Sequence, residues 1–139
     1  AVDRSLHTNG DVIDAARELC AAGVECVLAS LGPDGMIAVT KDHSWAARTP
    51  PIKVINTVGA GDSTLAGFLS AVAESTTAEA DERYGVGFDV PKGVTTAVQW
   101  GAVAVQQPTS GLQNLDGMPE AFLTVEPNRE EPLGEPAII

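Results

Sequence analysis

Two glycines and an aspartate stand together near the middle of the chain, in the stretch Gly59-Ala60-Gly61-Asp62. Glycine permits backbone angles closed to other residues and lets a ligand approach the main chain. If this stretch opens a helix, its first amides have no partner inside the helix and, with the helix dipole, favour an anion. A carboxylate adds unfavourable charge beside an anion. Asp62 therefore makes more sense as a proton acceptor for a hydroxyl that attacks phosphorus.

The flanking residues predict that this stretch joins a strand to a helix. Residues 52–55 form a short β-branched run typical of a strand. After Asp62, apolar residues recur three and four positions apart, as on one face of a helix; they are Leu65, Phe68, Leu69 and Val72. The residues alone leave a simpler interpretation open, in which the glycines form only a tight turn and Asp62 caps the helix. No Gly-Lys-Ser/Thr follows the glycines, so the stretch is not a P-loop.

A longer segment around these residues resembles a family signature. Residues 56–69, NTVGAGDSTLAGFL, closely resemble the second signature of the PfkB carbohydrate kinases, within the ribokinase-like superfamily. The most similar branch phosphorylates sugar phosphates and includes 1-phosphofructokinases, tagatose-6-phosphate kinases and minor 6-phosphofructokinases. The resemblance implies that Asp62 is the catalytic base. It also implies that the amides of Gly59, Ala60 and Gly61 form an anion hole for the transferring phosphoryl group.

A second glycine-containing turn lies between two apolar runs that predict strands, at residues 24–31 and 36–40. From the residues alone, this turn fits a plain hairpin connection. The family resemblance implies a nucleotide site instead, near the ATP phosphates and ribose, formed by Ser30, Leu31, Gly32 and Gly35. The segment Thr109-Ser110-Gly111 also resembles a turn seen near the nucleotide in sugar-phosphate kinases.

The remaining pattern is typical of an α/β fold. Helices are predicted over residues 11–22 and 94–107, and further strands over 44–49 and 122–125. The strand at 24–31 is expected to be buried, parallel and central. Residues 74–89 predict a surface loop or a short polar helix. By resemblance, residues 1–125 are the C-terminal nucleotide-binding portion of a ribokinase-like three-layer α/β/α fold with a doubly wound, mostly parallel sheet. Residues 126–139, with three prolines and four glutamates, predict a flexible tail.

Composition excludes some classes of function. The 139 residues suffice for one modest domain, and 44% hydrophobic content is ordinary for a globular protein. A net charge of −11 argues against nucleic acid and acidic membrane surfaces as partners. Cys20 and Cys26 favour two buried thiols over a disulfide or a ligand pair. No signal peptide, membrane-spanning run or lipidation motif is recognisable, so a cytoplasmic location is the default expectation.

The resemblance implies ATP and Mg²⁺ as cofactors and a sugar phosphate as substrate, with fructose 1-phosphate converted to fructose 1,6-bisphosphate as the favoured reaction. Tagatose-6-phosphate kinase, 6-phosphofructokinase and a noncatalytic nucleotide-binding module are the alternatives. Family chains are longer, and these residues match their C-terminal half. The family's Asn-x-x-Glu motif, which places Mg²⁺, is expected upstream of the helix at Asp11, so no metal ligand is named. A homodimer through the N-terminal lid is likewise implied only for the longer protein, and this chain alone is expected to lack part of the site.

Overall fold

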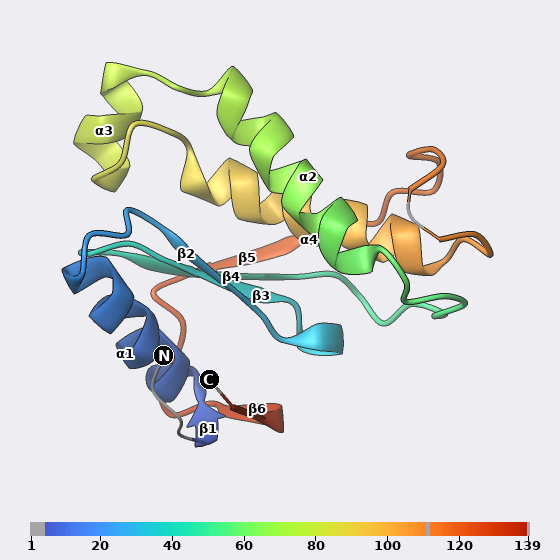
Figure 1. The fold of residues 1–139 in the computed structure, drawn as a ribbon, viewed down its shortest axis with the longest axis horizontal. Coiled ribbons are helices and arrows are strands. Elements are labelled where there is room, and N and C mark those ends of the chain that lie inside the picture. The colour runs from blue at the N-terminus through green and yellow to red at the C-terminus, as the bar shows by residue number, and fades with distance from the viewer. Residues whose placement is uncertain (1–4, 111, 139) are drawn as a thin grey trace.

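The computed structural model describes residues 5–110 and 112–138 as an α/β assembly of one four-stranded sheet with helices on both faces (Figure 1). In chain order, the elements are β1 (Ser5–Thr8), α1 (Asn9–Ala21), β2 (Val27–Ser30), the 3₁₀ turn η1 (Gly32–Asp34), β3 (Met36–Val39), β4 (Ser44–Arg48), α2 (Ala60–Glu74), α3 (Ala78–Tyr84), α4 (Val90–Val105), β5 (Phe122–Val125) and β6 (Pro132–Ile138). The predicted helices at 11–22 and 94–107 and the short helix within 74–89 are confirmed by α1, α4 and α3.

The main sheet has the order β2-β3-β4-β5, and each neighbouring pair is antiparallel. The mostly parallel sheet expected by resemblance is therefore not found among the described residues, in which every strand pairing is antiparallel. The expectation of a parallel, central strand at 24–31 is wrong for the same residues, because β2 pairs only with β3. The physical reason is the short connection after β2, because a few residues can join only antiparallel neighbours and a parallel pair needs a crossover. β2 is also only half-buried.

Strand β3 is buried on both faces and separates two hydrophobic cores. Met36 and Ala38 face α4 and contribute to a core with Trp45, Val90 and Val94. Ile37 and Val39 of β3 face α1 and join a second core. Its other main members are Leu6, Val12 and Ile13. Side chains alternate between the two faces of a strand, so this one strand positions both helical layers.

Helix α2 lies along α4 on the side away from the sheet (Figure 1). The two helices approach closely at Gly67, where an added Cβ would lie 2.9 Å from Cγ of Trp100 and 3.0 Å from the carbonyl oxygen of Thr96. The predicted apolar stripe of α2 is only partly buried. Phe68 is 6% exposed, whereas Leu65 and Leu69 are 50% and 54% exposed, because in the described residues α4 covers one side of α2 only.

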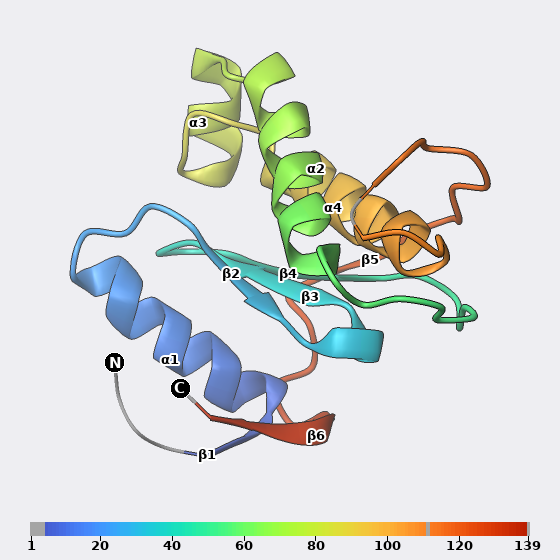
Figure 2. The same ribbon diagram turned by 45° about the vertical axis from the view of Figure 1, so that its right-hand side comes forward.

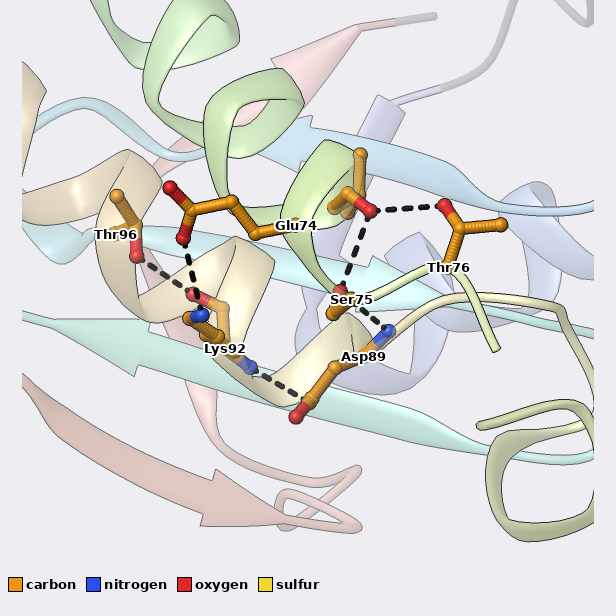
Figure 3. Close-up of polar contacts among 7 residues, drawn as sticks. Glu74, Ser75, Thr76, Asp89, Lys92 and Thr96 are labelled. Atoms are coloured by element: carbon orange, nitrogen blue, oxygen red, sulfur yellow. Dashed lines mark hydrogen bonds and ion pairs between the residues drawn. The ribbon is translucent and has the colours of Figure 1, made fainter. Parts of the chain in front are cut away.

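Polar contacts join the C-terminal end of α2 to the N-terminal end of α4 (Figure 3). The Asp89 amide donates to the Ser75 hydroxyl at 3.1 Å, and the Lys92 ammonium pairs with the Glu74 carboxylate at 3.4 Å. Asp89 also caps α4, since its carboxylate accepts from the Lys92 amide at 3.0 Å. These contacts fix the ends of the two helices on either side of the inserted helix α3.

The segment before α2 does not form the strand predicted at residues 52–55. Its end is held by α4 instead, because the amides of Ile55 and Asn56 donate to the Val105 carbonyl at 2.7 and 3.1 Å. The preceding Pro50 and Pro51 lack amide hydrogens, so this segment is poorly suited to continue a sheet. The β-branched composition of residues 52–55 was thus misleading.

Residues 126–139, for which we expected a flexible tail, contain β6, which pairs antiparallel with β1 (Figure 2). The residues just before β6 make polar contacts with α1. The Gly10 amide donates to the Arg129 carbonyl at 2.8 Å, and the Arg129 guanidinium contacts both carboxylate oxygens of Asp14 at 2.8 Å. The polar residues of this segment, whose composition predicted a flexible tail, therefore make specific contacts with α1.

The start of α1 is also closed by a capping box. The Asp11 amide donates to the Thr8 hydroxyl at 3.2 Å, and the Thr8 amide donates to the Asp11 carboxylate at 3.1 Å. Hydrogen bonds from the backbone amides of His7 and Thr8 lower the pKa of Asp11. This fixes the first turn of α1 at the point where the β1–β6 pair meets it.

Candidate functional site

The Gly-Ala-Gly-Asp stretch begins α2, as the sequence predicted. Gly59 is the N-terminal cap residue and has a left-handed backbone with φ of 81°, which favours glycine. The loop before it is held by Asn56, whose side-chain oxygen accepts from the Val58 amide at 2.9 Å and whose side-chain nitrogen donates to the Pro108 carbonyl at 3.4 Å. The end of α4 thus anchors the turn that opens α2.

The amides of this turn do not all have the same role. The Ala60 amide donates to the Thr57 carbonyl at 3.2 Å. Among the described residues, the amides of Gly59 and Gly61 have no protein acceptor. Gly61 and Asp62 are exposed, and the Asp62 carboxylate lies in the first turn of the helix. The Asp62 amide likewise has no protein acceptor among the described residues. The structure therefore places three unpartnered amides and one carboxylate together at a helix N-terminus, where an anion is favoured.

Two hydroxyl side chains follow immediately and were not singled out from the sequence. The Ser63 hydroxyl donates to the Gly59 carbonyl at 3.0 Å, and the Thr64 hydroxyl donates to the Ala60 carbonyl at 2.8 Å. Ser63 is buried and Thr64 is half-buried. A serine or threonine four residues after a helical carbonyl often makes this bond, so the spacing was a usable signal.

The second predicted site is the turn around η1, between β2 and β3. Ser30 ends β2 and is exposed, whereas Leu31 is half-buried. The Leu31 amide donates to the Gly35 carbonyl at 2.8 Å, and the Gly35 amide donates to the Gly32 carbonyl at 3.2 Å. Gly35 also lies against Ala47 of β4, so part of its role is packing. Figures 1 and 2 both show η1 and the start of α2 toward the same end of the sheet.

The C-terminal segment reaches the η1 turn. The Gly134 amide donates to the Asp34 carboxylate at 2.9 Å. No local pattern predicts this contact, since the two residues are 100 positions apart. Of the third predicted segment, Thr109 and Ser110 are exposed just after α4, and Gly111 lies outside the described residues.

Positive charge is scarce in the sequence around the start of α2. No lysine or arginine lies between Val54 and Arg83 in the sequence. In the part of the chain that the structure describes, no three His, Cys, Asp or Glu side chains gather closely enough to bind a metal ion.

An Asn-x-x-Glu spacing does occur downstream, at Asn128 and Glu131. It lies beside α1 rather than in the upstream position expected for the family motif. The Asn128 side-chain oxygen accepts from the Glu130 amide at 3.1 Å, and the Glu131 carboxylate lies 3.5 Å from the side-chain nitrogen of Asn9. The structure thus gives these two side chains local contacts.

The two cysteines are free and half-buried. Burial raises the pKa of Cys26 to about 12 and also raises that of Cys20. Such thiols are poor nucleophiles and poor metal ligands at neutral pH, in line with the interpretation as two packing residues. Within the described residues, no helix combines the length and apolar character needed to cross a bilayer.

Comparison with known proteins decides the family. Residues 2–116 match the sequence profile of the pfkB family carbohydrate kinases. The chain belongs to this family. Its Gly-Ala-Gly-Asp turn and its η1 turn both lie within the part that matches the pfkB profile.

Individual pfkB relatives support the same assignment. The chain is 48% identical to the 1-phosphofructokinase of Haloferax volcanii over 71 residues, which cover 51% of this chain and 23% of the relative. It is 37% identical to the ATP-dependent 6-phosphofructokinase isozyme 2 of Escherichia coli over 86 residues, 61% of this chain and 28% of the relative. The chain thus spans about a quarter of the length of these pfkB sequences.

Solved structures confirm the fold class. A protein from Staphylococcus aureus assigned as a phosphofructokinase superposes with a TM-score of 0.69 at 30% identity, covering 88% of this chain and 36% of that one. Phosphofructokinase-2 from Escherichia coli, solved in complex with potassium, gives a TM-score of 0.60 at 27% identity and covers 76% and 31%. The α/β fold expected from the sequence is therefore the ribokinase-like fold of pfkB kinases.

Proposed function

We propose that the chain supplies the phosphoryl-transfer end of an ATP-dependent sugar-phosphate kinase that converts fructose 1-phosphate to fructose 1,6-bisphosphate. The observation that carries this proposal is the start of α2, where exposed Asp62 stands beside the unpartnered amides of Gly59 and Gly61. This arrangement occurs in a chain of the pfkB family.

The choice of fructose 1-phosphate is supported by relatives named 1-phosphofructokinase, at 48% identity in Haloferax volcanii and 41% in Escherichia coli. The similarity to a 6-phosphofructokinase keeps fructose 6-phosphate as an alternative, with tagatose 6-phosphate beside it. All three substrates present an alcohol oxygen to the γ-phosphorus of ATP, so the role proposed for the α2 turn is the same for each.

In the proposed reaction, the carboxylate of Asp62 accepts the proton of the sugar hydroxyl as its oxygen bonds to the γ-phosphorus. The bond between the γ-phosphorus and the β,γ-bridging oxygen breaks, and ADP leaves with the electron pair. The amides of Gly59 and Gly61 donate to the oxygens of the transferring group. Donors of this kind stabilise the charge of the transition state, and losing one typically lowers the rate about a hundredfold or more.

Nucleotide binding is assigned, within this proposal, to the η1 turn with Ser30, Leu31, Gly32 and Gly35. Its support is the position of the turn toward the same end of the sheet as the start of α2. The exposed first turn of α2 and the exposed Ser30 leave this end accessible to a phosphate chain. Mg²⁺, when bound to ATP, would neutralise part of the phosphate charge, since the chain itself has a net charge of −11.

The test replaces Asp62 by Asn, which removes the proton acceptor and keeps the size of the side chain. We expect Mg-ATP affinity, measured by calorimetric titration, to stay nearly unchanged while transfer to each of the three sugar phosphates is abolished. Asp42→Asn, in the exposed turn between β3 and β4, is the matched control for the loss of one negative charge. An Asp62→Asn variant that keeps more than roughly a tenth of the parental rate contradicts the base role, given the usual size of acid–base effects.

A noncatalytic nucleotide-binding module is the second candidate. The exposed η1 turn and the exposed residues Gly61 and Asp62 at the start of α2 could bind a nucleotide without taking part in transfer. Such a module would bind Mg-ATP with no transfer dependent on Asp62. Transfer that is lost specifically in Asp62→Asn decides against it.

A further inference from the structure

The first turn of α2 is held from within by the hydroxyl of Thr64, which donates to the Ala60 carbonyl at 2.8 Å. The Ala60 carbonyl and the Gly61 amide belong to one planar peptide unit. Fixing the direction of the carbonyl therefore fixes the direction in which the Gly61 amide points. That amide has no protein acceptor among the described residues, so it is free to donate a hydrogen bond to a ligand.

Helix α4 determines where the Thr64 hydroxyl can lie. Thr64 is half-buried and faces Gly101, and an added Cβ at Gly101 would overlap the Thr64 hydroxyl and lie 4.0 Å from the Ala60 carbonyl oxygen. Threonine in a helix has few χ1 rotamers, one of which makes the bond to the carbonyl four residues back. The space left by Gly101 thus accommodates the rotamer that holds the Ala60 peptide.

We infer that Thr64 is a positioning residue that aims the Gly61 amide at the transferring phosphoryl group, with Gly101 providing the room it needs. The inference rests on the proposed function, because it assumes that the α2 turn binds a phosphoryl group. It extends that function to a side chain whose hydroxyl bonds to the Ala60 carbonyl. It also links the geometry of the α2 turn to the packing of α2 on α4.

The same hydrogen bond occurs elsewhere and could be only a general feature of helices. Thr96 of α4 donates to the Lys92 carbonyl at 2.8 Å (Figure 3). There, however, the amide of the same peptide unit belongs to Gly93 and is already bonded to the Asp89 carbonyl at 3.0 Å. The Thr96 hydroxyl therefore orients the Gly93 amide, which already has a protein acceptor, whereas the Thr64 hydroxyl orients the Gly61 amide, which has none among the described residues. Thr96 is the matched control for Thr64.

The experiment follows the backbone amides of Gly59 and Gly61 by NMR while inorganic phosphate is added to the folded chain. Thr64→Val keeps the volume and removes the hydroxyl, Thr64→Ser keeps the hydroxyl, and Thr96→Val makes the same change at the control position. In the parent chain, in Thr64→Ser and in Thr96→Val, we expect both amides to shift with phosphate. In Thr64→Val, we expect the phosphate-dependent shift of Gly61 to be lost while that of Gly59 remains.

Two other results have distinct meanings. If Thr64→Val shows the parental shift of Gly61, the positioning role is refuted and the proposed function stands. If neither amide shifts in the parent chain, the anion-binding turn of the proposed function is refuted, and the positioning role with it. Should Thr64→Val fail to fold, Gly101→Ala provides the same test from α4, because its methyl group displaces the hydroxyl; a retained Gly61 shift in that folded variant also refutes the inference.

Discussion

The close approach of α2 to α4 at Gly67 can be tested by adding one methyl group. In Gly67→Ala the new Cβ would lie 2.9 Å from Cγ and 3.0 Å from Cβ of Trp100, and 3.0 Å from the Thr96 carbonyl oxygen. These atoms are part of the α4 backbone or close to it, so they cannot move aside without shifting the helix. Overpacking of this kind costs about 1–3 kcal/mol.

The sign of the effect depends on a competing term. Alanine is about 1 kcal/mol more favourable than glycine inside a helix. Three contacts this short, two of them to atoms near the backbone, place the packing cost near the upper end of its range, about 3 kcal/mol. The net expectation for Gly67→Ala is therefore a loss of about 2 kcal/mol in the free energy of unfolding. For a domain of this size, that corresponds to a fall of about 7 °C in Tm.

Urea unfolding followed by circular dichroism measures this loss, and Ala66→Gly is the matched control. Ala66 is the exposed neighbour of Gly67 on α2, so the control measures the Ala–Gly propensity difference without the α4 contact. We expect a loss of about 1 kcal/mol for Ala66→Gly. If Gly67→Ala instead raises the free energy of unfolding by about 1 kcal/mol, the change is equal and opposite to that of the control, and helix propensity alone explains it. That result would refute the close approach of the two helices.

Two further predictions concern the capping box and the buried thiol. Thr8→Ala should cost about 1 kcal/mol in thermal unfolding. The pKa of Asp11 should stay below its usual value in an NMR titration of this variant, because the backbone amides of His7 and Thr8 that lower it remain. The stability that Asp11 contributes should therefore still be lost as pH falls through its lowered pKa, and an Asp11 that titrates at its usual value would contradict this. With its pKa raised to about 12, Cys26 should react with iodoacetamide at pH 8 roughly fiftyfold more slowly than in urea; equal rates would show that it is not buried. Because the unfolded thiol ionises near pH 8.5 and the folded one does not, the free energy of unfolding should fall between that pH and about 12.

The elements predicted from the sequence were those with local signals. The helix expected at residues 11–22 appears as α1 (Asn9–Ala21), because its apolar spacing and its Thr8 cap act within a few residues. The strand expected at residues 52–55 failed for a non-local reason, since the Val105 carbonyl of α4 takes the amides of Ile55 and Asn56. Half of the predicted stripe on α2 is exposed because only α4 covers that helix among the described residues.

The candidate site divides in the same way. The Gly-Ala-Gly-Asp motif could be placed at a helix start because glycines followed by helical periodicity are a local pattern. Its detailed geometry depends on contacts between distant residues, such as Thr64 with Gly101 and Asp34 with Gly134. Neither pair has a spacing that a single sequence makes visible. The assignment of roles to Asp62 and to the η1 turn remains a prediction.

The contact of the C-terminal segment with α1 has a consequence for the order of folding. Asn9 bonds to Asn128 and Glu131, and Asp14 pairs with Arg129, across 115 to 122 positions of sequence. Closing so long a loop is entropically costly, so these contacts form after the local helices and hairpins. The same segment supplies acceptors for the amides of Asn9 and Gly10 at the start of α1. Opening residues 128–131 therefore also frays the first turn of α1, so this segment and the start of α1 unfold as one cooperative unit.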